Sequence, residues 1–393
     1  MTWLAGRTDV LAAGFLLTFA SGPGQTWFIA LSGPALRGEL GLSHGAFGTL
    51  YAAATLLSGL TLLWAGAAVD RLPARRIAVA VSLGLGLSCL GMAMVGHPLA
   101  LVAALFGLRL CGQGLCAHVA LTSVARSFPH GRGRALSLAG LGFPAAEALL
   151  PLAVAAAIAA QGWRATWTVT GAVIILALPA LLTLLLRRAA PPELAGGTTH
   201  GTAILSRRDI LGSARFALLL PALVATGFVV TALFFHQGAV ASAKAWPVGW
   251  FAVCVPVYAV ASLAANLLAG ALVDRWGARA VLPWFVLPLT IAMALLALSD
   301  APRVALMAMA LTGLTAGCSN TVLTAALAEI YGTASLGTVR AVAATAMVLA
   351  SAASPAMAGL ALDAGVPVAA ILWAFAGLGL LAGPLAARGI ASG

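Results

Sequence analysis

The 393-residue chain contains little charge: Asp, Glu, Lys and Arg together make up 8% of it, and only ten residues are acidic. A water-soluble domain has about 25% charged residues, so this composition excludes a soluble globular protein. The P-loop, GxSxG and HExxH patterns are missing as well, which argues against ATP hydrolysis and common hydrolase chemistry. The five cysteines lack metal-ligand spacing and predict buried thiols. We therefore expect neither an enzyme nor a bound metal or cofactor.

Hydrophobic residues make up 62% of the chain instead, in apolar runs of about 20 residues, each long enough to cross a bilayer as a helix. The runs are unbroken rather than alternating, which favours helices over barrel strands. The sequence predicts an all-α membrane protein. Its twelve predicted transmembrane helices are 9–32, 45–67, 77–96, 99–125, 135–159, 165–186, 216–240, 247–269, 280–298, 303–328, 338–361 and 366–386.

The net charge of +11 comes from the predicted cytoplasmic loops, where most of the 21 Lys and Arg residues fall. Four are predicted on the opposite side: Arg37, Arg164, Lys244 and Arg303. An excess of Lys and Arg on one side is the positive-inside signal of a membrane protein, so no nucleic-acid partner is needed to explain it. We expect both termini in the cytoplasm and the protein in a bacterial inner membrane.

The predicted helices divide into two halves that share a repeated phrase. The longest polar stretch, 187–215, is the predicted linker between residues 1–186 and 216–393. GAAVDRLPAR at 66–75 and GALVDRWGAR at 270–279 agree at seven of ten positions, and each closes the second helix of its half. A second, weaker repeat consists of VALTSVARSF at 119–128 and VLTAALAEIY at 322–331. The pattern indicates a duplicated six-helix unit.

These loops resemble the signature loops of the major facilitator superfamily. The residues that match the signature are Gly66, Asp70, Arg71 and Arg75 in the first copy, and Gly270, Asp274, Arg275, Gly277 and Arg279 in the second. The first copy has Pro73 where the signature has glycine. The resemblance implies two six-helix halves related by a pseudo-two-fold axis and an alternating-access cycle around a site near the midplane.

Within that superfamily, SFPHGRGRA at 127–135 and AEIYG at 328–332 resemble the monocarboxylate-transporter-like branch. The loops are predicted to form a cytoplasmic gate, with Glu329 as the partner of Arg275 or Arg279. The alternative is that the charges of these loops only fix the topology.

Two ionisable residues are predicted deep in the membrane. Arg109 lies on the fourth helix with Gln113 one turn on, and Glu147 lies at a similar depth on the fifth. We expect the side chains of Arg109 and Glu147 to form an ion pair. In one hypothesis Glu147 binds a coupling proton while Arg109 alternates between Glu147 and an anionic group of the substrate, because arginine cannot release its proton. The alternative is a permanent structural ion pair.

Other polar residues follow helical faces that could line a cavity. The candidates are Gln25, Tyr51, Tyr258 and Asn320, and His236 with Gln237 near the end of the seventh helix. His236 could carry a proton or bind substrate, or it could be an interfacial anchor. Single Ser and Thr residues in such stripes can also serve helix packing.

Together these features predict a secondary active transporter, acting as a monomer in the lipid bilayer, for a small-molecule substrate. Proton coupling and a small organic anion are the favoured interpretation. The alternatives are a drug-like or metabolite efflux pump of the same fold and a non-transporting membrane receptor.

Overall fold

The computed structural model describes residues 7–128, 132–188, 205–247, 249–332 and 335–392. Every regular element in these ranges is a helix. The first eight α-helices and the two segments between them are α1 (Thr8–Ala20), η2 (Gly22–Gly24), α2 (Thr26–Leu31), α3 (Gly33–Leu40), α4 (His44–Arg71), α5 (Ala74–Ala93), α6 (Pro98–Gly107), η3 (Leu108–Cys116), α7 (Ala117–Ser127) and α8 (Arg132–Gly140). The long α9 (Gly142–Leu185) and η4 (Leu186–Arg188) follow.

The second part of the chain has the same character. Its helices are α10 (Arg207–Leu211), α11 (Ala214–Phe235), α12 (Gln237–Ala243), α13 (Trp250–Trp276), α14 (Ala278–Val281), α15 (Leu287–Leu298), α16 (Pro302–Tyr331), α17 (Leu336–Asp363) and α18 (Val368–Ala391). Within the described ranges, nine helical stretches are long and apolar enough to cross a membrane. One of these, 133–185, covers two of the predicted transmembrane helices. The all-α membrane architecture expected from the sequence is confirmed.

The chain forms two compact units. Unit 1 comprises Met1–Leu42 and Leu50–Thr198, and unit 2 comprises Ser43–Thr49 and Thr199–Gly393. Residues 189–204, the centre of the predicted linker, lie outside the described residues. The division at 187–215 therefore stays a prediction.

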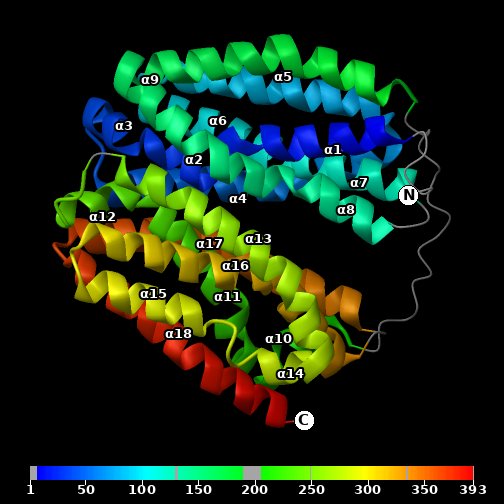
Figure 1. Ribbon diagram of the computed structural model, residues 1–393, viewed down its shortest axis with the longest axis vertical. Coiled ribbons are helices and arrows are strands. Elements are labelled where there is room, and N and C mark those ends of the chain that lie inside the picture. Colours follow the sequence, from blue (N-terminus) through cyan, green and yellow to red (C-terminus); the bar gives the residue numbers. More distant parts are fainter. Residues whose placement is uncertain (1–6, 129–131, 189–204, 248, 333–334, 393) are drawn as a thin grey trace. The chain divides into compact units, whose positions relative to one another are not determined.

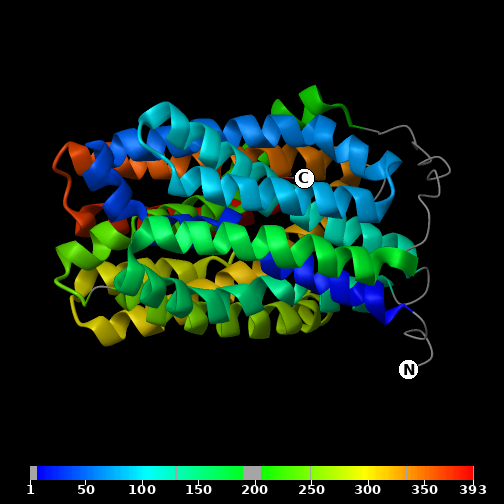
Figure 2. The ribbon, with the colours of Figure 1, turned by 90° about the horizontal axis from the view of Figure 1, so that it is seen from above.

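In unit 1, α5 packs along α9, and α1 packs against α7, α8 and α9 (Figure 1). A left-handed residue, Gly162 (φ 82°), divides α9 into two helices, so the chain turns back on itself there (Figure 2). Glycines allow α5 and α9 to approach closely, because a Cβ on Gly86 would lie 2.4 Å from Ile175. Such close approach is the usual way in which membrane helices associate.

In unit 2, α13 packs against α16, α11 against α17 and α18, and α15 against α16 and α18 (Figure 1). A Cβ on Gly317 of α16 would lie 2.0 Å from the carbonyl oxygen of Ser262 on α13. The first turns of α4 also belong to this unit. There the Asp363 carboxylate accepts hydrogen bonds from the backbone N–H groups of His44 and Gly45, at 2.9 and 2.8 Å.

A polar clamp fastens the end of α3 to the second part of α9 in unit 1. The Glu39 carboxylate accepts a hydrogen bond from Trp163 Nε1 at 2.7 Å. It also forms an ion pair with Arg164 Nη2 at 2.8 Å. Arg164 also donates to the carbonyl oxygens of Ala93 and Val95 at the end of α5. The Trp163 hydrogen bond, followed by those of Arg164, holds the pKa of Glu39 below its ordinary value of 4.5.

This lowered pKa predicts a pH-dependent contribution to stability. The clamp stabilises the fold above the pKa of Glu39 in the unfolded chain, and the contribution is lost as pH falls through the lower pKa of the folded state. We expect Glu39→Gln to lower the melting temperature of the purified protein at pH 7 and to flatten its decline between about pH 5 and pH 3. Asp9→Asn, which leaves the clamp intact, serves as the control. An unchanged melting curve for Glu39→Gln would contradict the clamp.

Candidate functional site

The first predicted transmembrane helix is broken where it meets the fourth. Gly22, Pro23 and Gly24 form a 3₁₀ turn between α1 and α2. Opposite them, Leu108–Cys116 is π-helical, a wider winding that is frequent at functional sites. A Cβ on Gly24 would lie 2.4 Å from the Leu108 carbonyl oxygen, and a Cβ on Gly112 would lie 2.7 Å from the Gly24 Cα. Glycine at both positions is therefore required for the two backbones to touch.

Arg109 lies at this contact. Its side chain is only 4% exposed, and its Nη1 donates a hydrogen bond to the Gly24 carbonyl oxygen at 3.1 Å. The guanidinium carbon also lies 5.2 Å from the centre of the Tyr51 ring, a cation–π geometry. Tyr51 in turn shares a 2.7 Å hydrogen bond with Thr26. The turn η2, the helix α4 and the π-helical segment η3 thus hold one buried cation.

The guanidinium is not fully satisfied by these contacts. Among the described residues, Arg109 Nε is buried and has no hydrogen-bond partner. A buried charge in a membrane protein is costly, and it is found where it faces a partner, a polar cavity or a ligand.

The expected pairing of Arg109 with Glu147 is absent from the described contacts. Glu147 lies half-buried on the first part of α9, and the ion pairs formed by described residues do not join it to Arg109. Arg109 instead donates to the Gly24 carbonyl oxygen, which is available because the helix is broken at Gly22–Gly24. Nearby, Gln113 is exposed, and Gln25 donates from Nε2 to Ser21 Oγ at 3.3 Å.

The other candidate residues belong to unit 2. His236 is buried, and its Nε2 donates to the Pro355 carbonyl oxygen at 2.8 Å. Its ring also lies 5.1 Å from that of Phe235 and 5.8 Å from that of His44. Gln237 is buried at the start of α12.

The remaining two candidates of unit 2 differ in exposure. Tyr258 is buried with its ring 5.1 Å from that of Phe234, and Asn320 is exposed on α16. The structure therefore brings Arg109 together with Tyr51 in unit 1, while the cavity roles of all these residues stay predictions.

The second signature loop is a capped turn. Gly277 has φ 78° and ψ 146°, a conformation that is open essentially to glycine alone, and it separates α13 from α14. The Glu329 carboxylate accepts hydrogen bonds from the backbone N–H groups of Ala278 and Arg279, at 2.8 and 3.0 Å. Arg279 in turn donates to the backbone carbonyl of Glu329. The expected partnership of Glu329 and Arg279 is thus a contact through the backbone, whose gating role stays a prediction.

The remaining signature residues are less constrained. Arg275 lies over the ring of Trp276 at 5.7 Å, Asp274 is exposed, and Gly270 has open space around it. The side chains of Asp70 and Arg71 lie outside the described residues.

The first loop turns differently from the second. Pro73 begins α5 with φ −56° and ψ 130°, whereas the matching Gly277 has positive φ. Arg75 is exposed, and a Cβ on Gly66 would lie 3.7 Å from His118 Nε2. The two copies of the phrase therefore share residues but not backbone geometry.

Sequence reasoning missed the joint between the first and fourth helices. The signals were GPG at 22–24 and the glycines of LRLCGQG at 108–114, because glycine and proline within an apolar run permit a break or a close backbone approach.

The backbone of the second loop predicts a difference between its two signature glycines. We expect Gly277→Ala to destabilise the protein by about 1–3 kcal/mol, because alanine is strained at this positive φ. Gly270→Ala is the matched control: its Cβ would meet nothing within 4 Å, and alanine is favoured in a helix. Thermal unfolding of both variants in detergent measures the difference. Equal melting temperatures would contradict the strained-turn account.

The fold is shared with solved transporter structures. A bacterial homologue of the human lysosomal transporter Spinster, in an inward-facing and unoccupied conformation, aligns over 99% of this chain and 95% of its own, with 16% identity and a TM-score of 0.73. The nucleoside transporter NupG aligns over 97% and 98%, with 12% identity and a TM-score of 0.75. At these identities the likeness shows the fold alone.

A search of curated proteins gave no match. The sequence model of the Major Facilitator Superfamily matches residues 14–257 and 239–390. With this match across most of its length, the chain belongs to the Major Facilitator Superfamily and is a membrane transporter rather than an enzyme.

Proposed function

We propose that this protein is a proton-coupled secondary transporter for a small organic anion, working by alternating access. The chain carries no nucleotide-binding motif, so the energy comes from an ion gradient or from the gradient of the substrate. The proposal includes both termini in the cytoplasm of a bacterial inner membrane and a monomeric protein. It also includes the division of the chain at 187–215.

The observation behind the anion preference is the buried Arg109. It donates to a carbonyl and faces an aromatic ring, while its Nε has no partner among the described residues. A guanidinium binds a carboxylate through two parallel hydrogen bonds, which a carbonyl oxygen cannot match. A substrate carboxylate would therefore displace the Gly24 contact at a net gain. The resemblance to the monocarboxylate-transporter-like branch agrees with this substrate class.

Glu147 is the proposed proton carrier. Its side chain is a half-buried carboxyl on α9, and arginine cannot release a proton under physiological conditions. In the proposed cycle, Arg109 binds the substrate while Glu147 is protonated. When Glu147 loses its proton, its negative charge attracts Arg109, and this attraction helps to release the substrate. The exposed Gln113 contributes a further hydrogen bond to the bound anion. His236, Gln237, Gln25, Tyr258 and Asn320 are proposed as lining residues.

The gate is proposed at the signature loops. The Glu329 contact with Ala278 and Arg279 fixes the turn that follows α13, and Asp274 and Arg275 are exposed on the last turn of that helix. Exposed charges on a rigid turn can bind helix ends and opposite charges in one state of the cycle and release them in the other.

The test is uptake of labelled small monocarboxylates and dicarboxylates into proteoliposomes, with and without a pH gradient. We expect Arg109→Gln to reduce uptake by about a hundredfold, because the lost ion pair is worth about 3 kcal/mol. Glu147→Gln should keep exchange of anion for anion but lose the stimulation by the pH gradient, because a neutral amide mimics the protonated carboxyl.

Arg303→Gln, at the opposite end of α16 from the second signature loop, is the matched control and should transport normally. Full pH-stimulated uptake by Glu147→Gln would remove the coupling role. If Arg109→Gln transported carboxylates at the wild-type rate while retaining a folded melting curve, the anion site would be wrong. Uptake of bulky cationic compounds alone would favour the drug-like alternative.

A further inference from the structure

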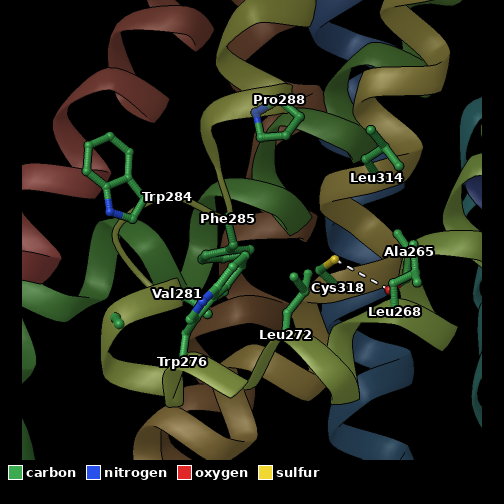
Figure 3. A pocket seen from close by; sticks show the side chains of 11 residues that line it. Ala265, Leu268, Leu272, Trp276, Val281, Trp284, Phe285, Pro288, Leu314 and Cys318 are labelled. Carbon is green, nitrogen blue, oxygen red and sulfur yellow. Dashed lines mark hydrogen bonds between the residues drawn. The ribbon is translucent and has the colours of Figure 1, made fainter. Parts of the chain in front are cut away.

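Unit 2 contains a lateral groove that the transport site does not use. It lies between α13, α14, α15 and α16, has a volume of about 530 Å³, and is lined by apolar side chains (Figure 3). Leu268 and Leu272 form one wall, and Trp276 and Trp284 lie toward one end. Cys318 also lines the groove, and its thiol donates a hydrogen bond to the Ala265 carbonyl oxygen at 3.5 Å. The lining therefore offers mainly apolar contact area.

The groove opens to the exterior of the protein. Leu268, Trp276 and Trp284 are all exposed, at 59%, 58% and 67%. Exposed apolar residues on a transmembrane helix face hydrocarbon. Contact of such a surface with water is unfavourable. An acyl chain of a lipid is chemically matched to such a lining.

The length of the groove matches one leaflet. Its wall on α13 runs from Ala265 to Trp276, which is about 16 Å along a helix. Half of the hydrocarbon core is about 15 Å thick. Trp276 ends the groove next to the charged loop, and tryptophan is enriched at the membrane–water interface. The groove thus spans from the interface to the bilayer centre, as a single acyl chain does.

A cation lies at the interfacial end. Arg275 is exposed, and its guanidinium lies 5.7 Å from the ring of Trp276, which lines the groove. The other charges at this end are Asp274 and Arg279 of the same loop and Glu329 at the end of α16. Glu329 and Arg279 are engaged with each other's backbone, and Asp274 occupies a helix position about 100° away from Arg275. Arg275 is therefore the group best placed to meet a phosphate.

We propose that this groove is a binding site for one phospholipid, with an acyl chain along Leu268 and Leu272 and its phosphate at Arg275. The site lies within unit 2 and is independent of the proposed substrate. A lipid held here would brace α14 and the second signature loop against α15.

The experiment is photo-crosslinking in proteoliposomes that contain a trace of phosphatidylglycerol with a diazirine in its acyl chain. We expect peptides containing residues 265–288 to carry most of the label in the wild type. Leu268→Trp, which fills the groove, should reduce this label by about tenfold, equivalent to about 1.4 kcal/mol of affinity. Leu267→Trp is the matched control, since Leu267 is the neighbouring residue, is 74% exposed and does not line the groove.

Two further variants keep the test decisive. Ala280→Trp fills the groove from α14 and replaces Leu268→Trp if that variant does not fold. Arg275→Gln should lower the label at 265–288 several-fold, whereas Arg303→Gln should not.

Label spread evenly over the exposed helices, or equal losses in Leu267→Trp and Leu268→Trp, would overturn the proposal in favour of unspecific lipid contact. Loss of the label together with a crosslinked dimer would assign the groove to a second copy of the chain and would overturn it as well. Neither outcome depends on transport of an anion, so this test is separate from that of the proposed function.

Discussion

The backbone contact between Gly24 and Gly112 is the constraint on which the candidate site depends. Because neither residue has a side chain, the broken first helix touches the π-helical part of the fourth, and the Gly24 carbonyl reaches the guanidinium of Arg109. The break supplies a free carbonyl acceptor within the membrane, where backbone carbonyl groups otherwise form hydrogen bonds inside their own helix. Among the described residues, the charge of Arg109 is therefore held by a backbone carbonyl rather than by a carboxylate.

Glycine also permits close backbone contacts and unusual backbone conformations elsewhere in the chain. In the α13 and α16 pair it brings two long helices together through Gly317, and at Gly277 it permits a turn that no other residue adopts without strain. Membrane helices gain no hydrophobic energy from one another in lipid, so close packing and backbone geometry largely determine the fold. The polar clamp of Glu39 and the capping of α14 by Glu329 add specific contacts at the helix ends, where water is available.

The sequence predicted the helical architecture because an apolar run of about 20 residues has one stable form in a bilayer. It did not predict where helices break, since the apolar pattern of 9–32 continues across Gly22–Gly24. The pairing of Arg109 with Glu147 was inferred from their similar depth on two helices that are adjacent in the chain. The direction in which a side chain leaves a helix changes where the helix becomes π-helical, and the sequence did not indicate this change. Glu329 was placed near Arg279 by its position at a helix end, but its bonds to backbone N–H groups depend on the conformation of Gly277. The groove at Trp276 involves four helices, so no local pattern could indicate it.

The central claim is that the surroundings of Arg109 open in turn to the two sides of the membrane. The most direct measurement places one cysteine at Gln113, which is exposed next to Arg109, in a variant whose five native cysteines are replaced. Membrane-impermeant maleimide is then applied from either side of oriented vesicles, with and without a pH gradient and a transported anion. The account predicts labelling from both sides, with the ratio shifted by the gradient or the anion. Labelling from one side alone under every condition would contradict it.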